Sequence, residues 1–212
     1  MDNHGRETYL REAFGVLIPR PSHPRLRQLK LAHQPHLQGY KMWNSTWLLL
    51  EFLGSRLSAG TTVLDAGCGW GLASVWCRRH GATVIATDAD PEVLPYLDFL
   101  AEVNGVEVAA RQLSFAAIPE ELLGRTGLLI GADICFRQSM VDPVYQLLRR
   151  AIEAGVERIA LADPGRPSFA ALAARCTAQL HATARQAEAP EPLIDWPGSG
   201  LKIRGRLLCY GF

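Results

Sequence analysis

The stretch that decides the fold is Val63-Leu64-Asp65-Ala66-Gly67-Cys68-Gly69-Trp70-Gly71. The run Thr62-Val63-Leu64 is short and apolar, as in a buried strand, and a helical pattern follows from about Leu72 to His80. The glycines between them predict a tight turn in which the backbone comes close to a ligand. Free N–H groups at the start of the helix suit a carboxylate or a phosphate.

The glycine spacing separates two kinds of ligand site. A dinucleotide fingerprint has glycine at its first, third and sixth positions, whereas here they fall at the first, third and fifth, at Gly67, Gly69 and Gly71. Asp65 stands two residues before the first glycine, where a carboxylate can reach a ligand ammonium group. Asp88 ends the next predicted strand, where a carboxylate can accept both hydroxyls of a ribose. A helix cap is the alternative role for Asp88, and it is the preferred role for Asp90, which precedes Pro91.

Outward from this turn, strands alternate with helices, which predicts a mostly parallel sheet covered on both faces. A helix beginning at Asn44 or Ser45 should end at Gly60, and Ser168 to Cys176 should be another helix. The last two strands are joined by a proline-rich connector, residues 188–200, and are therefore expected to be antiparallel. The fold class is α/β, a Rossmann-like three-layer sandwich with a seven-stranded sheet that ends in an antiparallel hairpin. The expected strands cover residues 62–64, 82–87, 106–112, 128–132, 158–162, 179–187 and 201–210.

Charge divides the 212 residues into two parts. The formal net charge is +1, but residues 1–42 hold seven Lys and Arg against three acids, which leaves about −3 for residues 43–212. We expect a basic N-terminal arm, either packed on the surface or acting as a lid or partner-recognition segment, followed by one domain. A neutral chain gives no reason to expect nucleic-acid binding, whereas the basic arm would suit an acidic protein partner.

The remaining composition predicts a reduced, cytoplasmic protein. The five cysteines are odd in number and widely spaced, so they indicate neither a disulfide framework nor a zinc site. His33 and His36 are separated by Pro35 and have no acid or cysteine nearby, so we expect no metal. The N-terminus lacks a hydrophobic signal core, and no apolar run approaches the length of a membrane span.

The glycine loop with Asp65 and Asp88, together with the order of elements over residues 43–212, resembles the class I (seven-β-strand) S-adenosylmethionine-dependent methyltransferases. The resemblance implies that Asp65, Asp88 and the three loop glycines hold S-adenosyl-L-methionine and its product S-adenosyl-L-homocysteine. Cys68 lies within the loop and is interpreted as a small filler.

Further motifs resemble the branch that contains the electron-transfer-flavoprotein β-subunit lysine methyltransferases and the predicted nicotinamide N-methylases. Asp133-Ile134-Cys135-Phe136 is similar to the Asp-x-x-Tyr/Phe motif after the fourth strand, which implies catalytic roles for Asp133 and Phe136. Asp163-Pro164-Gly165-Arg166-Pro167 is similar to a run after the fifth strand, which implies substrate contacts for Asp163 and Arg166. The alternatives are a helix cap at Asp133 and a rigid turn with an exposed Arg166.

Two more positions correspond to cofactor contacts in that branch. Trp43 matches a tryptophan near the cofactor, and the alternative for a lone aromatic residue is the core. Leu113 begins a stretch that reads Leu-Asp-Trp beside the adenine in the branch, but Ser114 and Phe115 replace the acid and the tryptophan here. Leu113 is therefore expected to contact the cofactor, and Phe115 supplies an aromatic face or a core side chain.

Three functions are compatible with these residues. The first is N-methylation of a protein lysine, in which Asp133 orients the amine. The second is N-methylation of a small, nicotinamide-like amine, which would need an enclosed pocket. The third is a non-catalytic module that keeps the fold for assembly, against which the intact glycine loop and Asp88 argue.

Overall fold

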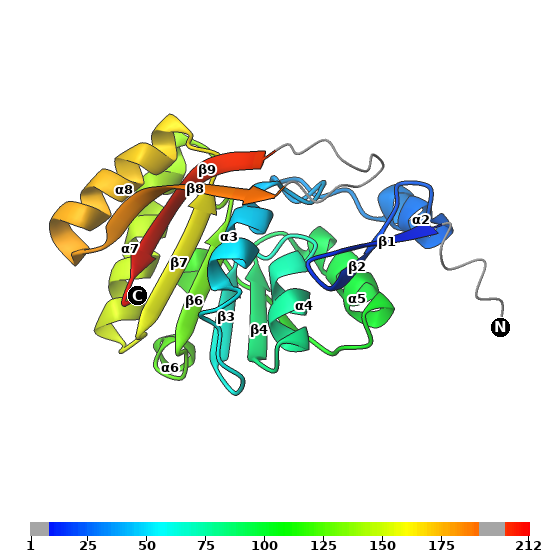
Figure 1. Ribbon diagram of the computed structural model, residues 1–212, viewed down its shortest axis with the longest axis horizontal. Coiled ribbons are helices and arrows are strands. Elements are labelled where there is room, and N and C mark those ends of the chain that lie inside the picture. Colours follow the sequence, from blue (N-terminus) through cyan, green and yellow to red (C-terminus); the bar gives the residue numbers. More distant parts are fainter. Residues whose placement is uncertain (1–8, 191–201) are drawn as a thin grey trace.

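A computed structural model describes residues 9–190 and 202–212 of the chain (Figure 1). Within them, seven strands form one sheet in the order β5-β4-β3-β6-β7-β9-β8. The first five in this order run parallel, whereas β9 is antiparallel to both of its neighbours. The predicted fold class is thereby confirmed. The strands are β3 (Thr62–Ala66), β4 (Thr83–Asp88), β5 (Ala109–Gln112), β6 (Leu128–Ala132), β7 (Arg158–Asp163), β8 (Thr183–Pro190) and β9 (Lys202–Tyr210).

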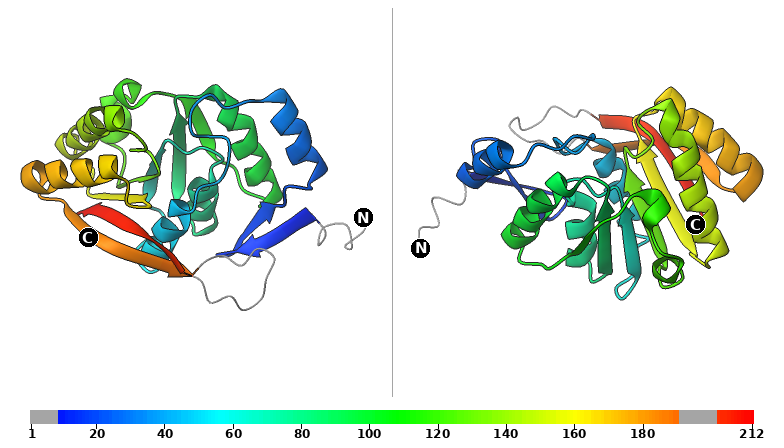
Figure 2. Two further views of the ribbon diagram at one scale, coloured as in Figure 1. Left: turned by 90° about the horizontal axis from the view of Figure 1, so that it is seen from above. Right: turned by 180° about the vertical axis from the view of Figure 1, so that it is seen from behind.

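Helices cover both faces of the sheet (Figure 2). Successive residues of a strand point to opposite faces, so Val63 packs with the helices of one face and Leu64 with those of the other. This apolar filling on both sides explains why the central strands are continuous hydrophobic runs. One face carries α3 (Ser45–Leu53), α4 (Leu72–Arg79) and α5 (Leu94–Val103), and the other α6 (Glu120–Leu123), α7 (Val141–Glu153) and α8 (Pro167–Leu180). Short 3₁₀ helices lie at Pro91–Val93 (η1), Phe115–Ala117 (η2) and Gln138–Met140 (η3).

Several expected boundaries were wrong. Strand β5 begins at Ala109 and not at residue 106, and β8 continues to Pro190, into the predicted connector. Helix α3 ends at Leu53 and not at Gly60, because Gly54 and Ser55 follow and are poor helix formers. Helix α8 continues to Leu180, so residues 179–180 are helical and not the start of a strand. It stops where His181 adopts a left-handed φ of 56°, and β8 begins only at Thr183. Of the predicted connector 188–200, the part from 191 onward lies outside the described residues.

The N-terminal arm holds regular structure. A two-residue turn at Phe14 and Gly15, both with positive φ, joins two short strands into a hairpin, and a helix then starts with Pro24 in its first turn. In Figure 1 these elements lie at the opposite end of the molecule from α8. They are β1 (Leu10–Ala13), β2 (Val16–Pro19) and α2 (Pro24–Ala32).

The hairpin is attached to the domain through strand β2. Val16 and Ile18 are fully buried in the same cluster as α3 and α4. The Asn104 amide, at the end of α5, accepts from the Leu17 N–H and donates to the Leu17 carbonyl, both at 2.8 Å. Burial of these two apolar side chains is worth about 3 to 6 kcal/mol, so the arm packs as part of the core. The boundary between residues 42 and 43 stays a prediction.

Three global features concern the described residues only. No helix among them is long and apolar enough to cross a bilayer. The five cysteines have free thiols. No group of three or more His, Cys, Asp and Glu side chains among them is placed to hold a metal ion.

Candidate functional site

A cavity of about 370 Å³ lies at the carboxyl ends of the parallel strands. Ligands of open α/β sheets bind at this edge, where the loops that leave the strands diverge. The walls come from the segments that follow β3, β4, β5 and β6 and from residues 37–43 of the arm. The sequence-predicted residues that line it are Trp43, Asp65, Gly67, Gly69, Asp88, Asp133 and Phe136.

The glycine loop opens its backbone toward the cavity. Gly67 has φ +73°, and a Cβ there would lie 2.7 Å from the Ile134 side chain, so only glycine fits. Gly69 has φ +52°, and a Cβ there would meet no atom within 4 Å, which leaves its main chain open to a ligand. Gly71 does not line the cavity. It begins α4 with φ +76° and packs against Leu97.

Asp88 ends β4 and holds the loop in place. One of its oxygens accepts a hydrogen bond from the Gly69 N–H at 2.9 Å, and the other accepts from the Asp90 N–H at 3.0 Å. Burial raises the pKa of this carboxyl above its ordinary value. Asp90 caps η1 by accepting from the Glu92 N–H at 3.1 Å, which confirms its predicted role.

Asp65 lies at the base of the cavity with only 2% of its surface exposed. One oxygen accepts the Ser74 hydroxyl at 2.6 Å. Burial raises the pKa of Asp65 to about 6, the Ser74 hydrogen bond opposes this, and the charge of Asp88 adds to it. A cationic group is the ligand that would relieve this buried carboxylate.

Asp133 follows β6 in a conformation that non-glycine residues seldom adopt, with φ +61°. Its N–H donates to the Ala162 carbonyl at 2.9 Å, and the residue is buried. Neither carboxylate oxygen receives a hydrogen bond of regular geometry from a described residue, but Arg166 Nη1 lies 2.6 Å from Oδ1. Burial raises the pKa of Asp133, while Ser45 and Arg166 lower it in part. A strained, buried, half-satisfied acid is typical of a working site.

Asp163 and Arg166 lie behind Asp133 and do not line the cavity. The fully buried Asp163 accepts the Gly165 N–H at 2.8 Å and the Arg166 N–H at 2.7 Å through Oδ1. Its Oδ2 accepts Arg166 Nη1 at 2.7 Å. Two carboxylates thus face one guanidinium, and an interaction of Arg166 with an acidic substrate group stays a prediction.

Several aromatic side chains line the cavity, and their contacts with a cofactor or an acceptor stay predictions. Trp43 and Phe136 line it, and the Trp43 indole donates to the Gln38 carbonyl at 2.6 Å. Leu113 does not line it, but its N–H donates to the Asp88 carbonyl at 2.8 Å. The neighbouring Ser114 and Phe115 form the wall instead.

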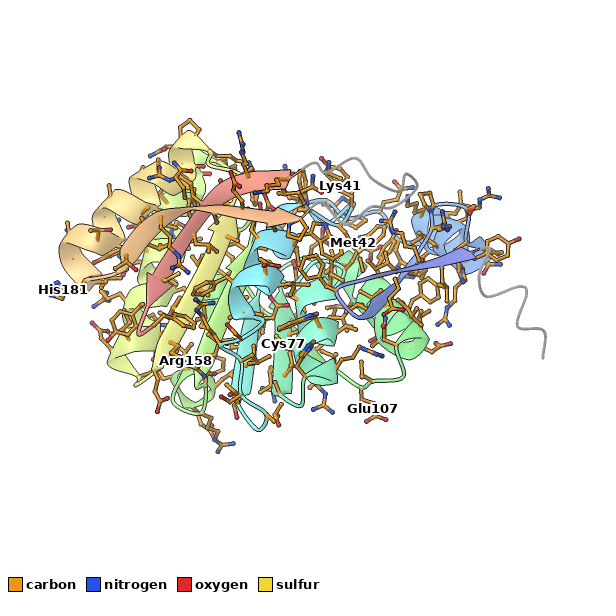
Figure 3. All side chains as sticks on the ribbon, in the orientation of Figure 1. Lys41, Met42, Cys77, Glu107, Arg158 and His181 are labelled. Atoms are coloured by element: carbon orange, nitrogen blue, oxygen red, sulfur yellow. The ribbon has the colours of Figure 1, made fainter. Side chains whose placement is uncertain are left out.

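The sequence interpretation missed the part that the arm takes in the cavity. The Gly39 carbonyl accepts the Trp70 indole at 2.7 Å, and the Asp90 carboxylate accepts the N–H groups of His36 and Leu37 at 2.6 and 3.0 Å. These contacts hold the segment over the strand ends; Figure 3 labels Lys41 and Met42 there. The only sequence signal was that these residues directly precede Trp43. The arm residues that line the cavity are Leu37, Gln38, Gly39, Lys41 and Met42.

Comparison with known proteins agrees with this geometry. The family described as "Methyltransferase domain" matches residues 64–121, which span the glycine loop and Asp88. The electron transfer flavoprotein beta subunit lysine methyltransferase of Danio rerio is 26% identical over 134 residues, 60% of this chain and 50% of that protein. The ribosomal protein L11 methyltransferase of Cupriavidus metallidurans is 35% identical over 91 residues, 42% of this chain and 28% of that protein.

The fold is shared more widely than the sequence. The crystal structure of ribosomal protein L11 methylase from Lactobacillus delbrueckii subsp. bulgaricus superposes with a TM-score of 0.57 at 19% identity, over 80% of this chain and 79% of that one. The chain spans half or less of the length of the two curated relatives named above. Residues 64–121 are therefore similar to the methyltransferase-domain family, the chain shares its fold with the ribosomal protein L11 methylase, and it resembles the electron-transfer-flavoprotein β-subunit lysine methyltransferases over part of its length.

Proposed function

We propose that this chain is an S-adenosylmethionine-dependent N-methyltransferase that acts on a protein lysine side chain. The observation that carries the proposal is that one cavity joins the open glycine loop, Asp65 and Asp88 to the buried carboxylate of Asp133. The glycine loop, Asp65 and Asp88 suit the binding of the cofactor, and Asp133 suits the binding of an amine acceptor.

The residues present fit S-adenosylmethionine. Asp65 is a buried carboxylate without a cationic partner among the described residues, which suits the amino group of the cofactor. Asp88 faces the same cavity, which suits the ribose hydroxyls, and the open main chain at Gly69 allows close approach. When bound, the cofactor would supply a sulfonium methyl group for transfer to the amine lone pair, with S-adenosylhomocysteine as the leaving group.

The chain itself contributes position and desolvation. A free lysine has a pKa of about 10.4, so presenting it as a neutral amine at pH 7 costs roughly 4 to 5 kcal/mol. The apolar side chains around Phe136 disfavour the ammonium form by excluding water. Asp133 accepts an N–H of the acceptor and so directs its lone pair. The positioning of both reactants as a whole can contribute roughly 7 to 11 kcal/mol.

The size of the cavity favours a side chain as the acceptor. Sites for a single drug-sized ligand have volumes of roughly 300 to 1,000 Å³, and this one, at about 370 Å³, is near the lower limit. A cavity of this size that takes the cofactor leaves room for an extended lysine entering from outside. The basic arm supports an acidic protein partner, and the names of the curated relatives include two protein methyltransferases. A small nicotinamide-like amine is the second candidate.

The five free thiols support a reducing compartment such as the cytoplasm.

Two measurements test the proposal. Calorimetric titration with S-adenosylhomocysteine should show binding, and no heat at millimolar ligand would exclude both enzyme functions. The protein, incubated with host lysate and S-adenosylmethionine that carries a tritiated methyl group, should then label macromolecules. Label only in the small-molecule fraction would favour the second candidate.

The role of Asp133 is tested by Asp133→Asn. This variant should lose turnover while its affinity for S-adenosylhomocysteine stays unchanged, because the acid faces the acceptor. Asp98→Asn, an exposed acid on α5, serves as the matched control and should change neither quantity. If Asp133→Asn instead loses cofactor affinity, Asp133 belongs to the cofactor.

A further inference from the structure

We infer that Arg166 is a positioning residue that shifts the protonation state of the acceptor amine toward the neutral form, by offsetting part of the negative charge of Asp133 and Asp163, so that Asp133 orients a neutral amine. The inference rests on the proposed function, because it concerns the acceptor side of the same cavity. It assigns to Arg166 a task different from contact with an acidic substrate group.

The geometry places one guanidinium nitrogen between two carboxylates. Arg166 Nη1 lies 2.6 Å from Asp133 Oδ1 and 2.7 Å from Asp163 Oδ2. The side chain of Asp163 is fully buried and that of Asp133 is 4% exposed, so neither charge is screened by water. The guanidinium also lies 5.6 Å from the centre of the Trp43 ring, which lines the cavity.

Asp163 fixes where Arg166 points. Through Oδ1 it accepts the main-chain N–H groups of Gly165 and Arg166 ahead of α8, and through Oδ2 it holds the guanidinium itself. Gly165 has φ +102°, which allows this tight turn. The main chain and the guanidinium of Arg166 are therefore both hydrogen-bonded to Asp163, which directs the guanidinium toward Asp133.

One oxygen of Asp133 is not directed at Arg166. Its Oδ1 faces Arg166, while Oδ2 is buried and receives no hydrogen bond of regular geometry from a described residue. Asp133 lines the cavity. The charged and polar groups that act on it are Arg166, Asp163 and the Ser45 hydroxyl at the start of α3, which is itself buried without a regular hydrogen bond.

The charge balance decides which form of the amine enters. A lone carboxylate in a desolvated site attracts an ammonium group and raises its pKa, and an ammonium has no lone pair with which to attack. Arg166 offsets that attraction, because its positive charge repels the ammonium form of the acceptor. With Arg166 paired to Oδ1, Oδ2 can accept an N–H of a neutral amine.

The first test is the pH dependence of methyl transfer from tritiated S-adenosylmethionine into host-lysate protein. In Arg166→Gln the acceptor pKa should rise, so the midpoint of the rate profile should move up by about one pH unit or more, and the rate near pH 7.5 should fall about tenfold or more. Near pH 10 the rate should recover to within a few-fold of the original. Arg166→Lys keeps a positive charge beside the two carboxylates and should keep the midpoint within about 0.5 pH unit.

The second test needs no acceptor and no bound cofactor. The ¹³C resonance of the Asp133 carboxyl, assigned by its loss in Asp133→Asn, reports the pKa of this group during a pH titration. Arg166→Gln should raise that pKa, whereas Arg175→Gln should not. Arg175 is the matched control because it lies on α8, the helix that Arg166 precedes, and also pairs with a carboxylate, Asp142, but neither residue lines the cavity.

The outcomes separate this inference from the proposed function. A rate that falls equally at every pH, or a raised acceptor KM with an unmoved midpoint, would overturn the role of Arg166 alone; the second result would make it a contact for an acidic substrate group. If Arg166→Gln and the unmodified protein have equal midpoints of thermal unfolding and equal affinities for S-adenosylhomocysteine, misfolding is excluded as the cause of a changed rate. Original protein that binds no S-adenosylhomocysteine, or transfers no methyl group, overturns the proposed function itself.

Discussion

The carboxylate of Asp88 accepts a hydrogen bond from the main-chain N–H of Gly69 at 2.9 Å. The acid that ends β4 therefore fixes the loop that ends β3, across the boundary between two neighbouring strands. The same side chain is thus both a candidate ribose ligand and a support of the loop on which the cofactor would rest.

Replacement of Asp88 by alanine should weaken S-adenosylhomocysteine binding about tenfold or more. The change removes the acceptor of two main-chain N–H groups as well as a ligand contact, and hydrogen bonds to a charged group are worth about 1.5 to 3 kcal/mol each. Calorimetric titration measures the loss. Asp98→Ala, on the exposed side of α5, should leave the affinity unchanged, and equal affinities of the two variants would contradict the role of Asp88.

Binding of S-adenosylhomocysteine should weaken as the pH falls below about 6. Burial raises the pKa of Asp65 to about 6, and only the ionised carboxylate attracts the ammonium group of the ligand. Affinity should fall by about tenfold for each pH unit below that value. Titrations from pH 5 to 8 test this. Asp65→Asn should bind weakly at every pH, and Asp133→Asn should keep the original dependence.

Asp65→Asn should raise the stability of the ligand-free protein at pH 8. The folded-state pKa lies above the ordinary 3.8, so the stability associated with Asp65 is fully present below about pH 3.8 and is lost as the pH rises through 6. An amide removes this loss while keeping an acceptor for Ser74, which gives a gain of about 1 to 3 kcal/mol. Urea unfolding at pH 8 measures it, and a destabilised variant would show that the charge is better compensated than its burial implies.

Gly39→Ala should displace the arm from the cavity. A Cβ at this position would overlap Val93 Cγ1, and the Gly39 carbonyl would lose its hydrogen bond from the Trp70 indole. S-adenosylhomocysteine affinity should fall several-fold. Adding Val93→Ala removes the overlapping atom and should restore the affinity, although the double variant is less stable in unfolding experiments.

A glycine elsewhere provides the control for that experiment. A Cβ at Gly127 would meet no atom closer than 3.7 Å, an ordinary contact, so Gly127→Ala should bind the ligand normally. Normal binding by Gly39→Ala as well would mean that residues 37–43 do not form part of the ligand site.

The regular part of the fold was predictable because its signals are local. Apolar runs bounded by glycine and proline located the five parallel strands, and the glycine spacing identified the turn after β3. Helix ends were less certain: α8 runs on through Thr177 to Leu180 because none of these residues breaks a helix, and only the left-handed His181 stops it. The hairpin of the arm was not predicted, because the basic charge of the arm indicates a surface segment, whereas the short apolar run Val16 to Ile18 is in fact buried.

The site was predictable residue by residue but not as an arrangement. Asp133 and Arg166 are 33 positions apart, and their contact depends on β6 and β7 being neighbours and on the left-handed turn at Asp133. The sequence around Asp133 indicates neither which strands are neighbours nor that this aspartate adopts a left-handed conformation. The line of residues from Leu37 to Met42 carries no motif, so its place in the cavity wall emerges only from the tertiary contacts of Asp90 and Trp70.

The internal position of β9 has a consequence for synthesis on the ribosome. Because β9 inserts between β7 and β8, a nascent chain that has not yet exposed residues 202–210 presents the open edge of β7, a template for unwanted pairing with other chains. Asp163 pairs with Arg206 in this register, and Gly205 packs so tightly against the Asp163 carbonyl that a Cβ would lie 2.5 Å from it. The turn that carries Asp163 and Arg166 therefore makes its contacts with β9 only after that strand has been translated. A chain that stalls just short of β9 should be prone both to aggregation and to loss of this turn.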